Sequence, residues 1–326
     1  MSVVPYHSDY AEVWNDFVEH SKNGTFLLKR HFMDYHAHRF IDCSLMVYKD
    51  KELIALFPAN FVKEEHTVYS HQGLTYGGLI MGRDITATDV LVTLKEICLW
   101  YTQHIHVSTL FYKPIPYIYT QYPSEEDLYA LFRMGAVLHT RAASSVVKLD
   151  NPLQMRTLRM RGVRKAQQIK LNIQSLSCKD DEAYQTFWNI LSQVLRECHG
   201  TSPVHTLDEI KLLSSRFPEN IKLFVVRREC EILGGCVVFE CKKLAHVQYI
   251  AASDAGKKEG ALDLLFHYLI TEYYKDAEYL DFGISTEQGG RILNEGLIFQ
   301  KEGFGARTVC YDSYRIELNT EVIESI

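Results

Sequence analysis

The sequence predicts an α/β chain made of two similar lobes, each a mixed sheet with helices on its faces. Three observations predict it: a globular composition, a short motif that occurs twice, and an order of helices and strands that repeats around both copies. The 326 residues are 47% apolar and 23% charged, which excludes a disordered or collagen-like chain. A chain of this length is expected to form two domains.

The repeated motif is Tyr-x-x-x-Trp-Asn, which begins at Tyr10 and again at Tyr184. Around each copy the apolar residues recur every three or four positions, so we expect helices at about 8–21 and 181–198. Matching segments at a fixed spacing indicate an internal duplication of the architecture.

The segments that follow each motif helix also correspond. Two short apolar runs joined by a polar turn predict a β-hairpin at 44–56 and another at 223–235. A third strand, a helix and a further strand then follow in each half. The predicted third strands are 67–71 and 245–250, the helices 88–103 and 260–275, and the last strands 107–112 and 279–284. A helix, a three-strand meander, a helix and a strand, repeated once, favour mixed sheets covered by helices.

The boundary between the lobes is predicted after residue 150. Pro152 follows an expected strand at 144–149 and precedes a new helix, as proline commonly does between elements. The sequence therefore predicts an N-terminal lobe of residues 1–150 and a C-terminal lobe of residues 151–326.

Charge and cysteine content limit the class of protein. A net charge of −6 argues against a surface devoted to nucleic acid, so DNA is not an expected partner. The sequence has no apolar run of membrane-spanning length and no signal peptide at Met1–His7. Its eight cysteines are scattered without a C-x-x-C pair, which favours a reduced, cytoplasmic protein without disulfides.

Residues 154–170 form a basic segment without any acid. Such a segment could bind phosphates, to which arginine offers a planar pair of donors. It could equally be a solvated helix face whose charges pair with acids elsewhere. The basic side chains are those of Arg156, Arg159, Arg161, Arg164, Lys165 and Lys170, and the expected apolar stripe of this helix is Met155, Leu158, Ala166 and Ile169.

The strand at 279–284 runs into a polar, glycine-rich loop at 285–290. A helix is expected at 291–301 and a final strand at 307–316, and backbone amides at the helix start could hold an anion. Lys301 ends this helix, where the helix dipole stabilises a cation. That dipole role is the alternative to a role in chemistry.

Other chemistries find little support. His31, His36 and His38 lie near Asp34 and Asp42, but no second cluster with zinc-ligand spacing occurs, so no metal is expected. No G-x-S-x-G elbow is present, nor a phosphate loop or dinucleotide-binding glycine motif. Hydrolases, kinases, ATPases and nicotinamide enzymes are therefore disfavoured.

Four stretches resemble the Fem peptidyltransferase family, a branch of the Gcn5-related N-acetyltransferase (GNAT) superfamily. They are Thr25–His36, Arg161–Ala166, Tyr279–Ile284 and Ile298–Gly305. The second is similar to the family pattern R-x-x-[IV]-R-K-A, and the fourth to [FY]-K-x-x-[FY]-G with Lys301 on its lysine. The resemblance implies two tandem GNAT-like lobes and transfer of an amino acid from aminoacyl-tRNA to an amine of a peptidoglycan precursor.

The resemblance also implies the site. Lys301 is the expected catalytic residue, a protonated lysine of ordinary pKa that holds the charge developing on the carbonyl oxygen. The expected substrate-binding residues are Arg161, Arg164, Lys165, Tyr35, His36, Tyr76, Asp281 and Ser285. Two features of the family have no counterpart here, namely the long charged helical arm and the N-terminal phosphate-contacting lysine. The acceptor could therefore be another cell-surface precursor, such as a polysaccharide sugar amine.

Two alternatives stay open. An acyl-coenzyme-A-dependent N-acyltransferase would cradle the pyrophosphate with a [QR]-x-x-G-x-[GA] loop. Lys257 and Gly260 have that spacing, but Leu262 replaces the last small residue. The second alternative is a non-enzymatic binder of polyanions.

No permanently bound cofactor is expected, because the acyl donor is aminoacyl-tRNA or acyl-coenzyme A. The expected partners are a nucleotide- or lipid-linked sugar or peptide precursor and aminoacyl-tRNA. A lipid-linked acceptor would bring the protein to the inner membrane surface.

Overall fold

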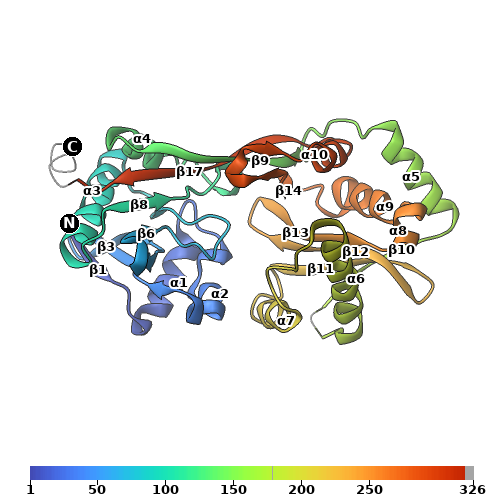
Figure 1. Cartoon of the computed structure of the whole chain (residues 1–326), viewed down its shortest axis with the longest axis horizontal. Coiled ribbons are helices and arrows are strands. Elements are labelled where there is room, and N and C mark those ends of the chain that lie inside the picture. Colours follow the sequence, from blue (N-terminus) through green and yellow to red (C-terminus); the bar gives the residue numbers. More distant parts are fainter. Residues whose placement is uncertain (178, 320–326) are drawn as a thin grey trace. The chain divides into compact units, whose positions relative to one another are not determined.

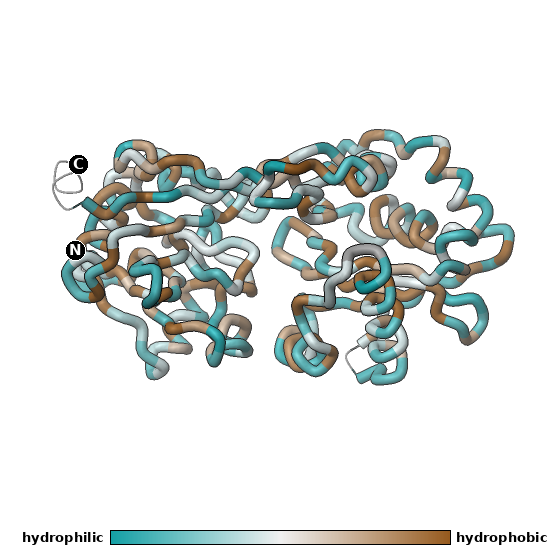
Figure 2. Tube along the Cα trace, in the orientation of Figure 1, coloured by the Kyte–Doolittle hydropathy of each residue, from teal (hydrophilic) through white to brown (hydrophobic). Residues whose placement is uncertain are grey.

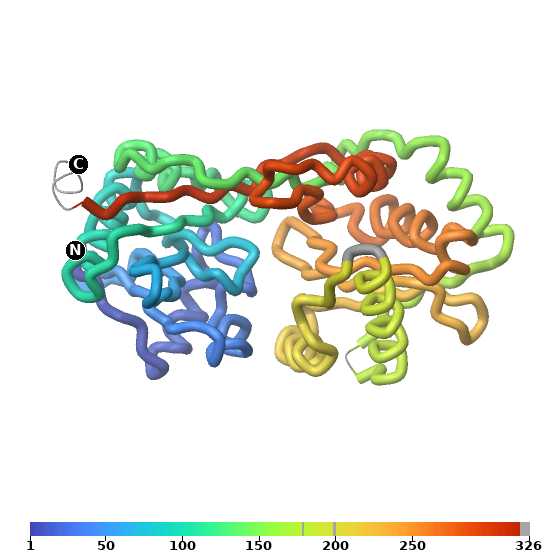
Figure 3. The backbone as a smooth tube through the Cα atoms, in the orientation of Figure 1, coloured from blue at the N-terminus to red at the C-terminus, as the bar shows by residue number. Residues whose placement is uncertain are grey.

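The computed structural model describes residues 1–177 and 179–319. The chain forms two compact units: unit 1 is Met1–Ala142 with Cys310–Ile326, and unit 2 is Ala143–Val309. It passes from one unit to the other twice, within β9 (Val137–Lys148) and within β17 (Arg307–Glu317) (Figure 3). This division differs from the predicted one because β17 pairs with β8 (Thr109–Tyr112), so the last strand belongs to unit 1 from Cys310 onward.

The sheet of unit 2 has the strand order β10-β11-β12-β13-β14-β9 (Figure 1). These strands are β10 (Asn172–Leu176), β11 (Ile221–Arg228), β12 (Glu231–Glu240), β13 (Leu244–Ala252) and β14 (Tyr279–Ile284). Neighbouring strands are antiparallel except β13 and β14, which run parallel from Leu244 and Tyr279 as far as His246 and Asp281. The two parallel strands are no longer paired beyond that point.

Helices cover this sheet. They are α5 (Thr157–Gln168), α6 (Asp181–His199), α7 (Leu207–Arg216), α8 (Asp254–Glu259), α9 (Ala261–Tyr268) and α10 (Glu295–Glu302). α6 packs on β12 and β13, whereas α9 packs between α5 and strands β11 and β12. α9 is apolar along most of its length (Figure 2), which fits its place in the core of this unit.

Unit 1 contains two sheets. The first has the order β1-β3-β4-β7, and the second includes the run β17-β8-β6-β5-β2. The strands are β1 (Ser2–Pro5), β2 (Ile41–Asp42), β3 (Leu45–Lys49), β4 (Glu52–Phe57), β5 (Asn60–Val62), β6 (Thr67–Tyr69) and β7 (Ile80–Met81). The main helices are α1 (Ala11–His20), α3 (Ala87–His104) and α4 (Glu126–Arg133). Within the described residues no helix is long and apolar enough to cross a membrane.

Both motif helices and both hairpins are present. α1 and α6 carry the two copies of the motif, and β3–β4 and β11–β12 form the predicted hairpins. The tryptophans of the motif, Trp14 and Trp188, are both buried. Tyr10 is exposed whereas Tyr184 is buried, so the two copies share a buried tryptophan and differ at the tyrosine.

The predicted three-strand meander is correct in unit 2 and wrong in unit 1. There β6 pairs with β5 and β8 and not with β4. The physical reason lies at Pro58, which follows β4 directly and has no N–H to continue a ladder. The chain starts β5 after it, and β5 takes the place beside β6.

Three further expectations are corrected locally. The resemblance to the Fem family implies an aromatic-rich helix at 25–36, whereas the structure has a series of short helices there, η2 (Phe26–Leu28), α2 (Arg30–Met33) and η3 (Asp34–Arg39). The loop after β14 forms a small hairpin of β15 (Thr286–Glu287) and β16 (Ile292–Leu293), so the next helix begins at Glu295 instead of residue 291. The helix predicted to reach residue 275 leaves the α form after Tyr268 and continues as a π-turn.

The cysteines that the structure describes form no disulfide with one another. They are Cys43, Cys98, Cys230, Cys236, Cys241 and Cys310. Cys178 and the side chain of Cys198 lie outside what the structure describes.

Candidate functional site

Lys301 is held at the end of β14 by two backbone carbonyls. Its Nζ donates hydrogen bonds to the carbonyl oxygens of Gly283, at 2.8 Å, and Ile284, at 2.9 Å. The residue is only 7% exposed. Burial lowers the pKa of the Lys301 ammonium to about 8, an effect that the negative charge of Asp281 partly opposes. The expectation of an ordinary pKa is therefore wrong.

The backbone of β14 is shaped for this contact. The pairing of β14 with β9 shifts register between Asp281 and Ile284. Gly283, inside that irregularity, has φ +75°, a conformation that costs glycine little and other residues more. The irregular stretch supplies the two carbonyls that accept from Lys301.

Asp281 is a fully buried carboxylate with protein partners on both oxygens. Its Oδ1 accepts from Ser144 Oγ at 2.5 Å and from the backbone N–H of Gly283 at 2.9 Å. Its Oδ2 lies 2.7 Å from Nδ1 of His246. Asp281 was predicted to bind substrate, and its burial indicates that it acts through these neighbours.

Ser144 and His246 were not identified from the sequence. His246 lies in the apolar strand β13, between Ala245 and Val247. A polar side chain inside such a run must find a buried partner, since burying it unpaired is costly. That isolated polar residue is the signal that could have identified it, but nothing in the sequence shows that Asp281 is the partner.

Ser285, the first residue after β14, is buried. Its backbone N–H donates to the carbonyl of Ala143 at 2.8 Å, and its own carbonyl accepts from Asn294 at 2.9 Å. Within the described part of the chain the Ser285 hydroxyl has no hydrogen-bond partner. The structure thus brings three of the predicted residues, Asp281, Ser285 and Lys301, together at the end of β14.

The basic segment divides into paired and unpaired side chains. Arg156 pairs with Glu302 at 3.1 Å, and Arg159 pairs with Asp263 at 2.9 Å. Arg161 and Arg164 are exposed and make no ion pair within residues 1–177 and 179–319. The prediction of charges paired with acids is therefore confirmed for Arg156 and Arg159, whereas phosphate binding by Arg161 and Arg164 stays a prediction.

The inner face of α5 also differs from the predicted stripe. Val163 and Ala166 are buried, whereas Leu158 and Ile169 are exposed. Lys165 reaches across to α8, where its Nζ donates to the carbonyl of Lys258 at 2.8 Å.

The segment proposed for a coenzyme pyrophosphate is covered by α5. Gly260 lies against the backbone of Gly162, so closely that a Cβ at position 260 would come 2.5 Å from the Gly162 carbonyl oxygen. Upstream, the N–H groups of Gly256 and Lys257 donate to the side chain and the carbonyl of Ser253. These two amides are therefore already used within the protein.

The remaining predicted residues belong to unit 1. Tyr76 is buried, with its hydroxyl 2.9 Å from that of Thr25. The buried ring of His36 lies 4.2 Å from that of Tyr35 and 5.6 Å from that of His71. Burial lowers the pKa of His71 to about 3, so this imidazole is neutral near pH 7.

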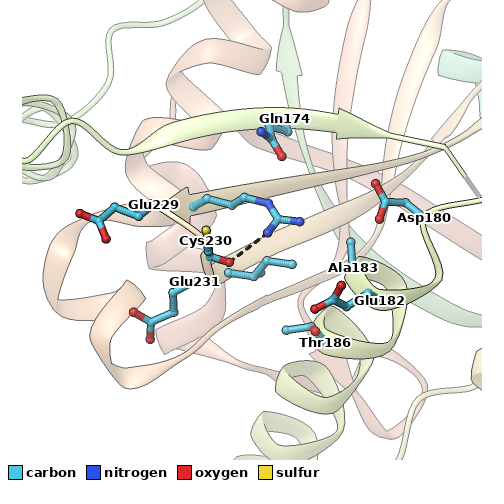
Figure 4. Close-up of a pocket in the computed structure, with 10 residues that line it drawn as sticks. Gln174, Asp180, Glu182, Ala183, Thr186, Glu229, Cys230 and Glu231 are labelled. Atoms are coloured by element: carbon cyan, nitrogen blue, oxygen red, sulfur yellow. Dashed lines mark hydrogen bonds between the residues drawn. The ribbon is translucent and has the colours of Figure 1, made fainter.

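Unit 2 also contains a separate pocket of about 600 Å³, between β10, the first turns of α6 and the β11–β12 turn (Figure 4). It is lined by Gln174, Asp180, Glu182, Ala183, Thr186, Arg227, Glu229, Cys230, Glu231 and Ile232. Four carboxylates against one guanidinium favour a cation over a phosphate there. None of the predicted site residues lines this pocket. Among the described residues, no cluster of three or more His, Cys, Asp or Glu side chains could hold a metal ion.

Residues 154–288 match the model of the acetyltransferase (GNAT) domain family. Unit 2 carries a GNAT domain. The protein is accordingly an acyltransferase, and GNAT domains generally take the acyl group from acyl-coenzyme A. No curated protein matches the sequence.

Several solved structures share the fold over most of the chain. FemX is 12% identical, with a TM-score of 0.70 and 100% of both chains covered. L-PGS from Bacillus licheniformis is 14% identical, with a TM-score of 0.63 and coverage of 96% of this chain and 92% of that one. The C-terminal domain of a putative lysylphosphatidylglycerol synthetase from Agrobacterium fabrum is 12% identical, with a TM-score of 0.55 and coverage of 83% and 84%. The predicted Fem-like fold is confirmed by FemX, and the GNAT family model places a GNAT domain in unit 2.

Proposed function

We propose that this GNAT protein transfers an aminoacyl group from aminoacyl-tRNA to an amine of a cell-wall or cell-surface polysaccharide precursor in the cytoplasm. The observation that carries the proposal is the buried ammonium of Lys301 at the end of β14. The shared fold with FemX and with a lysylphosphatidylglycerol synthetase supports aminoacyl transfer over acetyl transfer.

In this reaction the acceptor amine attacks the ester carbonyl carbon of aminoacyl-tRNA. A C–N bond forms, the carbonyl oxygen becomes negative, and the C–O bond to the tRNA ribose then breaks. An ammonium has three N–H donors, and Lys301 uses two on the carbonyls of Gly283 and Ile284. The third donor is the one we assign to the developing oxyanion, since such stabilisation is often the largest catalytic effect.

Arg161 and Arg164 are the groups we assign to substrate phosphates. They are exposed and unpaired within the described residues, so their donors are available without breaking an ion pair. Lys165 lies on the same helix. We assign Tyr35, His36 and Tyr76 to contacts with the acceptor, and Ser285 to the reacting centre beside Lys301. A lipid-linked acceptor would bring the protein to the inner membrane surface.

Acyl-coenzyme A is the second candidate donor, because GNAT domains generally use it. The covered backbone at Gly260 weighs against it, since a pyrophosphate would have to displace the contact with Gly162. Lys257, the other residue predicted for the coenzyme, bonds to Asp254 at 3.2 Å on its own helix. The other alternative, a non-enzymatic polyanion binder, is set aside because unit 2 carries a GNAT domain.

The test is a transfer assay with two donors. The purified chain is given either radiolabelled aminoacyl-tRNA or radiolabelled acetyl-coenzyme A, together with a UDP-linked muramoyl pentapeptide or a glucosamine-bearing lipid-linked saccharide. We expect label to move from tRNA to one of these amines. Transfer from acetyl-coenzyme A alone would establish the second candidate, and no transfer from either donor would overturn the proposal.

A further inference from the structure

A primary amine is protonated near neutral pH and cannot attack a carbonyl until it loses a proton. A positioned base that removes this proton contributes roughly 10²–10⁴-fold to a rate. Lys301 is unsuited to that task if it is to remain an ammonium facing an oxyanion. The reaction proposed above therefore calls for a second titratable side chain close to Lys301.

His246 lies at the position where β13 and β14 separate. His246 and Asp281 are the last pair in the parallel register of these strands. Because paired residues of parallel strands lie side by side, the imidazole meets the carboxylate directly, with Nδ1 2.7 Å from Oδ2. The His246 side chain is 11% exposed while that of Asp281 is fully buried, so a reactant can reach the pair only through the imidazole.

The contacts of Asp281 set the tautomer of His246. The carboxylate already accepts from Ser144 and from the N–H of Gly283. An ionised carboxylate only accepts hydrogen bonds, so the imidazole nitrogen that faces it must carry the proton. The neutral ring then has its proton on Nδ1 and its lone pair on Nε2, the form in which histidine acts as a base.

Gly283 links this pair to Lys301. Its carbonyl accepts from the Lys301 ammonium at 2.8 Å, and its N–H donates to Asp281. A Cβ atom added to Gly283 would lie 3.4 Å from Cε1 of His246. The imidazole edge and the ammonium therefore both lie near Gly283.

We propose that His246 is the general base of the transfer and that Asp281 is its positioning residue; this rests on the proposed acyl transfer. Nε2 takes a proton from the acceptor ammonium, and the neutral amine forms the C–N bond to the acyl carbon. When the C–O bond of the donor breaks, the leaving oxygen takes a proton and one further proton is released to solvent. The imidazole faces the carboxylate of Asp281 on β14, and the ammonium of Lys301 on α10 donates to the carbonyl of Gly283.

The activity test compares two acceptors in His246→Asn. The asparagine amide can keep a hydrogen bond to Asp281 but has no basic nitrogen. With an ordinary amine acceptor we expect kcat to fall about 10²-fold or more, at a nearly unchanged KM. With an analogue that carries a hydrazide in place of the amine, which is neutral at the assay pH and needs no base, the variant should approach the wild-type rate. An equal loss on both acceptors would overturn the proposal.

A second measurement does not depend on turnover. Nitrogen-15 NMR of the wild-type chain should show His246 protonated on Nδ1 with the lone pair on Nε2, and Asp281→Asn should shift that balance. The opposite tautomer in the wild type would overturn the assignment of the base. A wild type that moves no acyl group from either donor would instead overturn the proposed function, so the two failures are distinct.

Discussion

The ammonium of Lys301 donates a hydrogen bond of 2.8 Å to the carbonyl oxygen of Gly283, which joins the last turn of α10 to the irregular end of β14. A lysine that only complemented the helix dipole would be solvated, and the dipole would favour its charge. Here burial dominates and lowers the pKa of the ammonium to about 8. We assign this buried charge to the reacting centre because it lies at the end of β14, beside Ser285 and Asp281.

Lys301→Met should lower turnover by roughly 10²-fold or more while leaving acceptor binding nearly unchanged, because the lost donor acts on the transition state. Lys301→Arg should rescue only partly, since a planar guanidinium differs in shape and donor geometry from a compact ammonium. Steady-state kinetics and calorimetry with the acceptor measure the two effects.

Lys113→Met is the matched control for this substitution. Lys113 is a lysine of unit 1 whose pKa burial likewise lowers to about 8 and whose Nζ donates to the carbonyl of Leu74. We expect this variant to keep its turnover. Full activity in Lys301→Met, or equal losses in both variants, would remove Lys301 from the reaction.

Turnover should fall as the pH rises through about 8, where Lys301 loses its proton. Stability should change in the opposite direction. The folded pKa lies below the unfolded value, so between about 8 and 10.5 the unfolded chain binds more protons and the free energy of unfolding rises with pH. The cost of the buried charge is fully present below pH 8 and is relieved above it.

Denaturant unfolding of the wild type and Lys301→Met across this range isolates the effect of one lysine. The wild type should gain on the order of 1–3 kcal/mol relative to the variant between the two ends of the range. A constant difference between them would show that Lys301 titrates at its ordinary pKa.

Replacing both Arg161 and Arg164 by alanine should weaken binding of a phosphate-bearing substrate and reduce the salt dependence of that binding. Both side chains are exposed, so the melting temperature should stay within a degree or two of the wild type. Lys275→Ala removes an exposed positive charge from another part of unit 2 and serves as the control. Equal binding of the substrate by the double variant and the control would show that the two arginines contact only solvent and do not bind the phosphates.

Gly260→Ala should destabilise the chain more than Gly200→Ala. Both glycines have positive φ, +78° and +61°, so each alanine costs about 1 kcal/mol of backbone strain. A Cβ at position 200 meets nothing within 4 Å, whereas one at 260 meets the carbonyl of Gly162 at 2.5 Å. We expect a further 1–3 kcal/mol, roughly, for Gly260→Ala, measured by urea unfolding. Equal costs would mean that α5 does not pack closely on this segment.

The duplicated elements could be predicted because each rests on local periodicity. The helices around Trp14 and Trp188 and the two hairpins need only apolar spacing and turn residues. The same reasoning failed after β4, where Pro58 ends the strand and β5 pairs with β6. A local pattern predicts that a strand forms but does not show which strand pairs with it.

The composition and sequence of the chain determined its α/β class and the repeated order of its elements, since these depend on residue type and on spacing along one segment. The choice of Lys301 came from the resemblance of residues 298–305 to the Fem family pattern. Only the tertiary structure decided that Lys301 is buried against Gly283, that Arg159 pairs with Asp263 while Arg161 makes no ion pair within the described residues, and that His246 meets Asp281. The physical reason is that burial and pairing join residues far apart in the chain: His246 and Asp281 become neighbours only because β13 and β14 run parallel and then separate.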